Sequence, residues 1–107
     1  MRWTVVFADV RVEAALHRAQ PDFIARFIRY AERMEVYGPD LGMPHTRAMG
    51  GGLFELRLKG PGGAMRVFYG VLNDQRIVFL HHFVKKSAKT PSRELAVARE
   101  RLRKLLT

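Results

Sequence analysis

Residues 53–84 read LFELRLKGPGGAMRVFYGVLNDQRIVFLHHFV, and this stretch decides the fold. It holds three segments rich in β-formers, at 53–59, 64–72 and 76–84. The first alternates strictly, with Phe54, Leu56 and Leu58 on one face and Glu55, Arg57 and Lys59 on the other. Turn-forming residues separate the segments, Gly60-Pro61-Gly62-Gly63 and Asn73-Asp74-Gln75. Two short turns between three strands predict an antiparallel meander.

Upstream of the meander, the sequence predicts one strand and a helical hairpin. Residues 3–8 are rich in β-formers and predict a strand, and residues 10–19 predict a short helix. Pro21 suits the first turn of a second helix, which Gly38-Pro39 ends. The apolar residues of this second helix recur at helical spacing: Phe23, Ile24, Phe27, Ile28, Ala31 and Met34. Residues 40–52, with three consecutive glycines, are expected to form a loop.

Downstream of the meander, residues 85–89 are expected to form a basic loop before a last helix. Thr90 is expected to cap that helix and Pro91 to occupy its first position. The predicted fold class is α+β, with an N-terminal strand and helical hairpin, a three-stranded antiparallel meander and a C-terminal helix. The chain has 107 residues, which fits a single domain over 1–107.

The composition excludes several protein classes. The absence of cysteine excludes a disulfide framework, a thiolate metal site and a cysteine nucleophile. The first apolar run is too short for a signal peptide or a membrane span, so we expect a cytoplasmic protein with no membrane partner.

The positive charge is concentrated in the second half of the chain. The formal net charge is +9. Residues 1–44 carry six basic and six acidic residues, whereas residues 45–107 carry thirteen and four. This asymmetry favours a surface that faces a polyanion, either nucleic acid or acidic protein. A solvated surface with a basic bias is the plainer alternative.

The sequence offers little support for metal-dependent or nucleophile-dependent chemistry. Of the histidines, His81 and His82 are adjacent on a predicted strand and should point to opposite faces, so no metal and no cofactor are expected. A Gly-x-Ser-x-Gly motif is absent, and the glycine runs lack the Gly-Lys-Ser/Thr of a phosphate-binding loop.

A basic set near the strand ends is the remaining candidate site. Arg57 lies on the polar face of the first meander strand, Arg66 opens the second, and Lys85, Lys86 and Lys89 follow the third. One interpretation is that these residues converge on one sheet face and form a site. The other is that they are solvated charges at the strand ends. Lys59, Lys89 and Arg47 are expected to bind RNA.

RNA cleavage is chemistry that such a set can perform. The 2′-hydroxyl of RNA attacks the adjacent phosphate, so the protein needs only to move protons and stabilise charge on phosphorus. Arginine suits the phosphate, and histidine or a lysine with a lowered pKa suits proton transfer. Phe68 or Tyr69 can stack a base, although the core is the better assignment for both.

Several motifs together resemble the phage-derived, HigB-like branch of the RelE/ParE toxin superfamily. They are Leu53-Phe54-Glu55-Leu56-Arg57, Arg66-Val67-Phe68-Tyr69, and Leu80-His81-His82-Phe83-Val84-Lys85-Lys86-Ser87-Ala88-Lys89-Thr90-Pro91, with Glu94 and Ala98-x-x-Arg101 in the last helix. The resemblance covers nearly the whole chain. It implies a toxin of a type II toxin–antitoxin system that acts as a ribosome-dependent, metal-independent mRNA endoribonuclease.

The resemblance also implies roles for individual residues and for partners. Arg57 and Arg66 would stabilise the transition-state charge, and His82, Lys85 or Lys86 would transfer protons. The chain departs from relatives that carry a tyrosine or histidine near the C-terminus, because it ends in a leucine-rich helix. The partners implied are mRNA in the A site of the small ribosomal subunit and a helix-turn-helix antitoxin.

Two alternative functions remain open from the sequence. One is a ParE-like toxin that inhibits gyrase, although such a protein needs no phosphate-binding arginines. The other is a non-catalytic, phage-derived protein that binds nucleic acid.

Overall fold

The predicted meander forms the centre of the computed structural model, which describes residues 2–61, 63–86 and 88–107. The elements in chain order are β1 Thr4–Phe7, α1 Val10–His17, α2 Pro21–Tyr37, β2 Thr46–Gly50, β3 Leu53–Gly60, β4 Gly63–Leu72, β5 Arg76–Lys85 and α3 Ser92–Leu106. Gly62 of the predicted connection and Ser87 of the predicted basic loop lie outside the described residues. The α+β class and the helical hairpin are confirmed.

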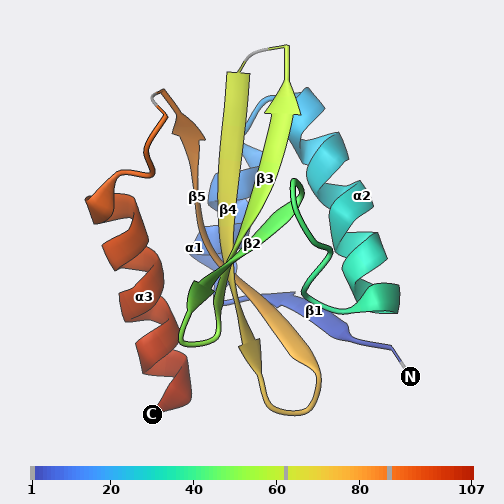
Figure 1. Cartoon of the computed structure of the whole chain (residues 1–107), viewed down its shortest axis with the longest axis vertical. Helices are drawn as coiled ribbons and strands as arrows, with labels where there is room; N and C mark the ends of the chain where they lie inside the picture. The colour runs from blue at the N-terminus through green and yellow to red at the C-terminus, as the bar shows by residue number, and fades with distance from the viewer. Residues whose placement is uncertain (1, 62, 87) are drawn as a thin grey trace.

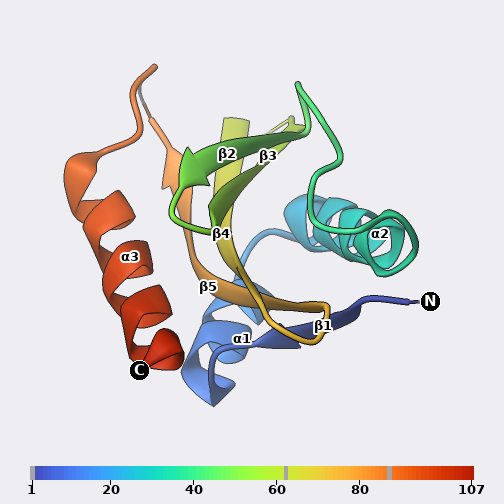
Figure 2. The same ribbon diagram turned by 60° about the horizontal axis from the view of Figure 1, so that its bottom comes forward.

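The strands form one five-stranded sheet in the order β1-β5-β4-β3-β2. β1 pairs parallel to β5, and the other neighbours are antiparallel. The helical hairpin of α1 and α2 packs on one side of this sheet and α3 on the other, as Figures 1 and 2 show. None of the helices in the described ranges is long and apolar enough to cross a membrane.

β2 lies inside the segment expected to be a loop, so the sheet has more strands than the sequence predicted. Thr46 pairs with Leu56 and Ala48 with Phe54, and an irregularity follows at Ala48/Gly50. Gly50, Gly51 and Gly52 all have positive φ and form the turn into β3. The strand is short, mostly exposed and contains a glycine, so its own residues carry little β-propensity, and it forms by pairing with the adjacent β3.

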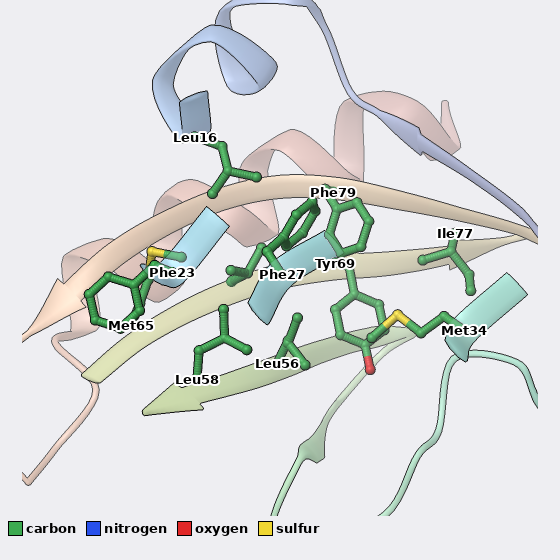
Figure 3. Packing of buried hydrophobic residues seen from close by; sticks show 11 residues of the cluster. Leu16, Phe23, Phe27, Met34, Leu56, Leu58, Met65, Tyr69, Ile77 and Phe79 are labelled. Atoms are coloured by element: carbon green, nitrogen blue, oxygen red, sulfur yellow. The ribbon is translucent and has the colours of Figure 1, made fainter. Parts of the chain in front are cut away.

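Two apolar layers hold the helices on the sheet. Beneath α2, Phe27 packs edge-on against Phe79 at a ring distance of 4.6 Å, within the cluster drawn in Figure 3. In the same layer the buried Tyr69 hydroxyl donates a hydrogen bond to the Pro39 carbonyl. Beneath α3, Leu102 packs against Gly70 in a second cluster. Tyr69 and Phe68 are therefore core residues on opposite faces of β4.

A β-bulge in β5 sets the direction of every side chain that follows it. Phe68 pairs with His81 and Tyr69 with Phe79, so Leu80 is an extra residue in β5. The bulge reverses the alternation, which places His81, Phe83 and Lys85 on the α3 face of the sheet. His82 consequently points to the α1 face.

The last helix begins differently from the sequence expectation. Pro91 is the N-cap residue of α3, and no side chain caps the helix with a hydrogen bond. The Thr90 hydroxyl is instead directed into the sheet, where it donates to Glu55 Oε2 at 3.0 Å. Its partner there is a buried carboxylate. A missing hydrogen bond costs more free energy at a buried carboxylate than at an exposed helix end, where water can replace it.

Candidate nucleic-acid interface

Arg57 and Arg66 form a cross-strand pair over a buried acid. They are register partners on β3 and β4 and so lie on the same face of the sheet, together with Glu55. Arg57 Nε lies 4.0 Å and Arg66 Nε 3.8 Å from Glu55 Oε1. The exposed fraction of the side chain is 4% for Arg66 and 2% for Glu55, whereas Arg57 is 28% exposed. One carboxylate thus anchors two guanidinium groups, and only Arg57 reaches the surface.

The Arg66 guanidinium is not fully hydrogen-bonded by the protein. Its Nη1 donates to the Met65 carbonyl at 3.4 Å, and its buried Nε has no hydrogen-bond partner among the described residues. Burial and the neighbouring Arg57 lower the pKa of Arg66, and Glu55 opposes this shift. Buried cations are normally satisfied, so an incompletely paired arginine makes this position a candidate site for an anion.

Lys85 adds a further cation to the same face. It ends β5, opposite Ala64, and the bulge at Leu80 turns its side chain toward Arg66. Burial is the main cause that lowers the pKa of Lys85. The charges of Arg66, Arg57 and Arg47 lower it further, while Glu55 raises it. A lysine with a lowered pKa is a better proton donor than an isolated surface lysine.

A group of five residues, termed here the cationic cluster, collects on this side of the molecule. Arg47 on β2 pairs in register with Glu55, and Lys59 follows Arg57 on the same face of β3. The cluster consists of Arg47, Arg57, Lys59, Arg66 and Lys85. Lys86 is exposed one residue beyond β5, and Lys89 is exposed between β5 and α3, so both extend the positive surface.

A cavity opens at the edge of β3, where β2 no longer pairs with it. Its volume is about 330 Å³. We call it the edge cavity; its lining is Arg26, Tyr30, Pro44, His45, Arg57, Lys59 and Arg66. The Arg57 backbone N–H donates to the His45 carbonyl at 2.8 Å, and Arg57 Nη1 lies 3.9 Å from Met43 Sδ. α2, the segment before β2, and Arg57, Lys59 and Arg66 of the cationic cluster therefore share one hollow.

The two adjacent histidines of β5 lie apart from the edge cavity. His81 faces α3, where its Nε2 lies 2.6 Å from Glu94 Oε1. His82 faces α1 in a hollow lined by Ala15 and Arg18, and burial lowers its pKa. The structure therefore brings Arg57, Arg66 and Lys85 together and leaves His82 on the opposite side of the sheet. Within the described residues, no group of three His, Cys, Asp or Glu side chains is placed to hold a metal ion.

The sequence interpretation missed several residues of this site. Glu55 was assigned to a polar face, although a glutamate two positions from an arginine on one strand face is a signal for an ion pair. Arg26 is exposed on α2, Tyr30 is partly buried against the core cluster, and His45 comes from the unrecognised approach to β2. Local sequence gave no signal for these three, because only the packing of α2 against the edge of β3 brings them to the cavity.

Comparisons with known proteins agree with this architecture. The model of a family described as phage derived protein Gp49-like matches residues 14–103. None of the curated protein sequences matches the chain. The fold is similar to that of a mutant of the E. coli toxin RelE in the free state, with a TM-score of 0.58, 15% sequence identity, and coverage of 95% of this chain and 99% of that chain. The resemblance to the RelE superfamily is thereby confirmed at the level of the fold: the chain belongs to the phage-derived Gp49-like family and has a RelE-like fold.

Proposed function

We propose that the protein is the toxin of a type II toxin–antitoxin system and cuts mRNA on the ribosome. The observation that carries the proposal is the Arg57–Arg66 pair held over Glu55 beside Lys85. A phosphodiester is the ligand that two guanidinium groups and an ammonium group recognise best. The RelE-like fold and the Gp49-like family support a toxin of this kind.

The proposed reaction is a transesterification within the RNA. The 2′-oxygen attacks the adjacent phosphorus, the bond from phosphorus to the 5′-oxygen breaks, and the products are a 2′,3′-cyclic phosphate and a 5′-hydroxyl. Arg57 and Arg66 stabilise the negative charge that grows on the non-bridging oxygens. Lys85 gives a proton to the departing 5′-oxygen, since its lowered pKa makes it the stronger acid. Lys86, one residue further along the chain, is the alternative donor.

The remaining cations would hold the substrate. Arg47, Lys59 and Lys89 are proposed to contact the RNA backbone near the scissile phosphate. Such contacts carry no sequence information but position the strand. The substrate would be mRNA in the A site of the small ribosomal subunit, which places the activity in the cytoplasm.

A helix-turn-helix antitoxin is the proposed protein partner. An acidic segment laid over the cationic cluster would neutralise it and keep RNA away from Arg57. This arrangement predicts that antitoxin and RNA compete for the same face.

Purified protein incubated with mRNA, with and without translating ribosomes, tests the proposal. We expect cuts only when ribosomes translate, with cyclic phosphate at the new 3′ ends. Induced expression without an antitoxin should arrest growth. Folded protein that makes no cuts under either condition would overturn the nuclease proposal, and inhibition of gyrase would then be the activity to assay.

A further inference from the structure

His45 is held against the cationic cluster by its own backbone. It immediately precedes β2, and its carbonyl accepts the Arg57 N–H at 2.8 Å. Its side chain is half-buried and lines the edge cavity together with Arg57 and Arg66. The other three histidines are not among the residues that line this cavity, as far as the described residues define it. An imidazole is therefore placed in the same hollow as the proposed phosphate-binding arginines.

Tyr30 fixes the orientation of that imidazole. The Tyr30 hydroxyl lies 2.9 Å from His45 Nδ1, and the two ring centroids are 5.2 Å apart. The Arg33 guanidinium also lies over the Tyr30 ring, at 5.4 Å from its centroid, and helps to hold the phenol in place. Only Nδ1 of His45 is hydrogen-bonded within the described residues, so Nε2 remains available.

We infer that His45 is the general base of the proposed RNA cleavage and that Tyr30 is its positioning residue. This inference rests on the proposed function. In the tautomer whose Nδ1–H donates to the Tyr30 oxygen, the neutral imidazole has an unprotonated Nε2, and the inference assigns this tautomer to His45. Nε2 takes the proton of the 2′-hydroxyl as the 2′-oxygen bonds to phosphorus. The bond to the 5′-oxygen then breaks, and that oxygen takes a proton from Lys85, so the proton removed and the proton supplied balance.

The other groups of the site are poorly suited to accept this proton. Glu55 is buried and occupied by Arg57, Arg66 and Thr90. His82 lies in a separate hollow beneath α1, and His81 is paired with Glu94. The arginines stay protonated throughout. His45, by contrast, has a side chain that can accept a proton, and it lies in the edge cavity beside Arg57 and Arg66.

Ribosome-dependent cleavage by His45→Ala and His45→Gln proteins tests the inference, with His17→Ala as the matched control. His17 is exposed in the last turn of α1 and lies outside the edge cavity. We expect both His45 variants to lose about 100-fold or more in the rate of cleavage while binding ribosomes normally. Added imidazole should restore part of the activity of His45→Ala, because it can enter the vacated space. Tyr30→Phe should lower the rate by about tenfold, as expected when a hydrogen bond that orients a base is lost.

The outcomes separate this inference from the proposed function. If the wild-type protein cuts and both His45 variants cut equally well, the His45 inference is overturned and the nuclease function stands. Loss in His45→Ala that His45→Gln restores also overturns it, since glutamine can hold Tyr30 but cannot act as the base. If the wild-type protein makes no cuts, the proposed function fails and the inference fails with it.

Discussion

Arg66 Nε lies 3.8 Å from the Glu55 carboxylate without forming a hydrogen bond to it, and both side chains are almost fully buried. The pair neutralises charge inside the sheet, and it leaves part of the Arg66 guanidinium available to bind an anion. A buried ion pair with incomplete hydrogen bonding contributes little to stability and is better suited to holding an arginine in place.

Glu55→Gln should lower the free energy of unfolding by about 3 kcal/mol, because it leaves Arg66 buried without a counter-charge. Urea unfolding followed by circular dichroism measures this change. Glu100→Gln is the control, since Glu100 pairs with Arg103 at the surface of α3 and such exposed pairs contribute about 0–1 kcal/mol. Equal losses in the two variants would contradict the role given to Glu55.

Gly70→Ala should destabilise the protein by about 1–3 kcal/mol through overpacking. A Cβ at Gly70 would lie 2.5 Å from Leu102 Cδ1, so the Leu102 side chain would have to rotate or α3 would have to move away from the sheet. The matched control is Gly60→Ala, where the nearest atoms are at 3.5 Å, an ordinary contact. Thermal unfolding should separate the two variants, and a Gly70→Ala protein as stable as Gly60→Ala would show that α3 does not approach β4 so closely.

His82 should make the protein less stable in mild acid. Burial lowers its folded-state pKa, with the charges of His81 and Arg18 acting in the same direction and Glu94 in the opposite one. The unfolded chain therefore binds more protons below the ordinary histidine pKa of about 6.5, and stability falls as the pH drops through that value toward the folded-state pKa. Above about pH 6.5, His82 is neutral in both the folded and the unfolded chain, so it no longer changes the stability with pH.

His82→Gln should remove that part of the pH dependence. The measurement is the free energy of unfolding at about pH 7.5 and about pH 5, compared with the wild-type protein and with His17→Gln at the surface. An identical pH dependence in wild type and His82→Gln would refute the placement of His82 against α1.

Lys59→Ala should weaken RNA binding and reduce the slope of log affinity against log salt by about one, as expected for one phosphate contact. Fluorescence anisotropy with a short single-stranded RNA over a salt series provides the slope. Lys104→Ala, in the last turn of α3 and outside the cationic cluster, should leave the slope nearly unchanged. If both substitutions change the slope equally, the RNA has no preferred face.

The sequence predicted those parts of the fold that depend on local periodicity. The alternation in residues 53–59 and the helical spacing from Phe23 to Met34 each report a buried face, and the structure contains both elements. β2 was missed because the strand is short, mostly exposed and ends in glycine, so its own residues show no alternating buried face. An edge strand of this kind is defined by the sheet rather than by its own sequence.

The site was less predictable than the fold for two physical reasons. The bulge at Leu80 reverses the alternation of β5, so that Lys85 joins Arg66 while His82 turns away, and nothing in a near-continuous apolar run signals it. The edge cavity requires α2 to meet the segment before β2, which is a tertiary contact between Tyr30 and His45. The sequence offered convergence of Arg57 and Arg66 on one sheet face as one of two interpretations, and the register of β3 and β4 pairs them.

Cleavage of translated mRNA by Arg57→Gln protein, beside wild type and Arg76→Gln, tests the central claim most directly. Arg57 is partly exposed at the site, and Arg76 is an exposed arginine paired with Asp74 at the far end of β5, so both variants should fold. We predict a loss of about 100-fold in the rate for Arg57→Gln, comparable to removal of one transition-state donor, and no loss for Arg76→Gln. Wild-type rates in both variants would contradict the assignment of the cationic cluster as the site of RNA cleavage.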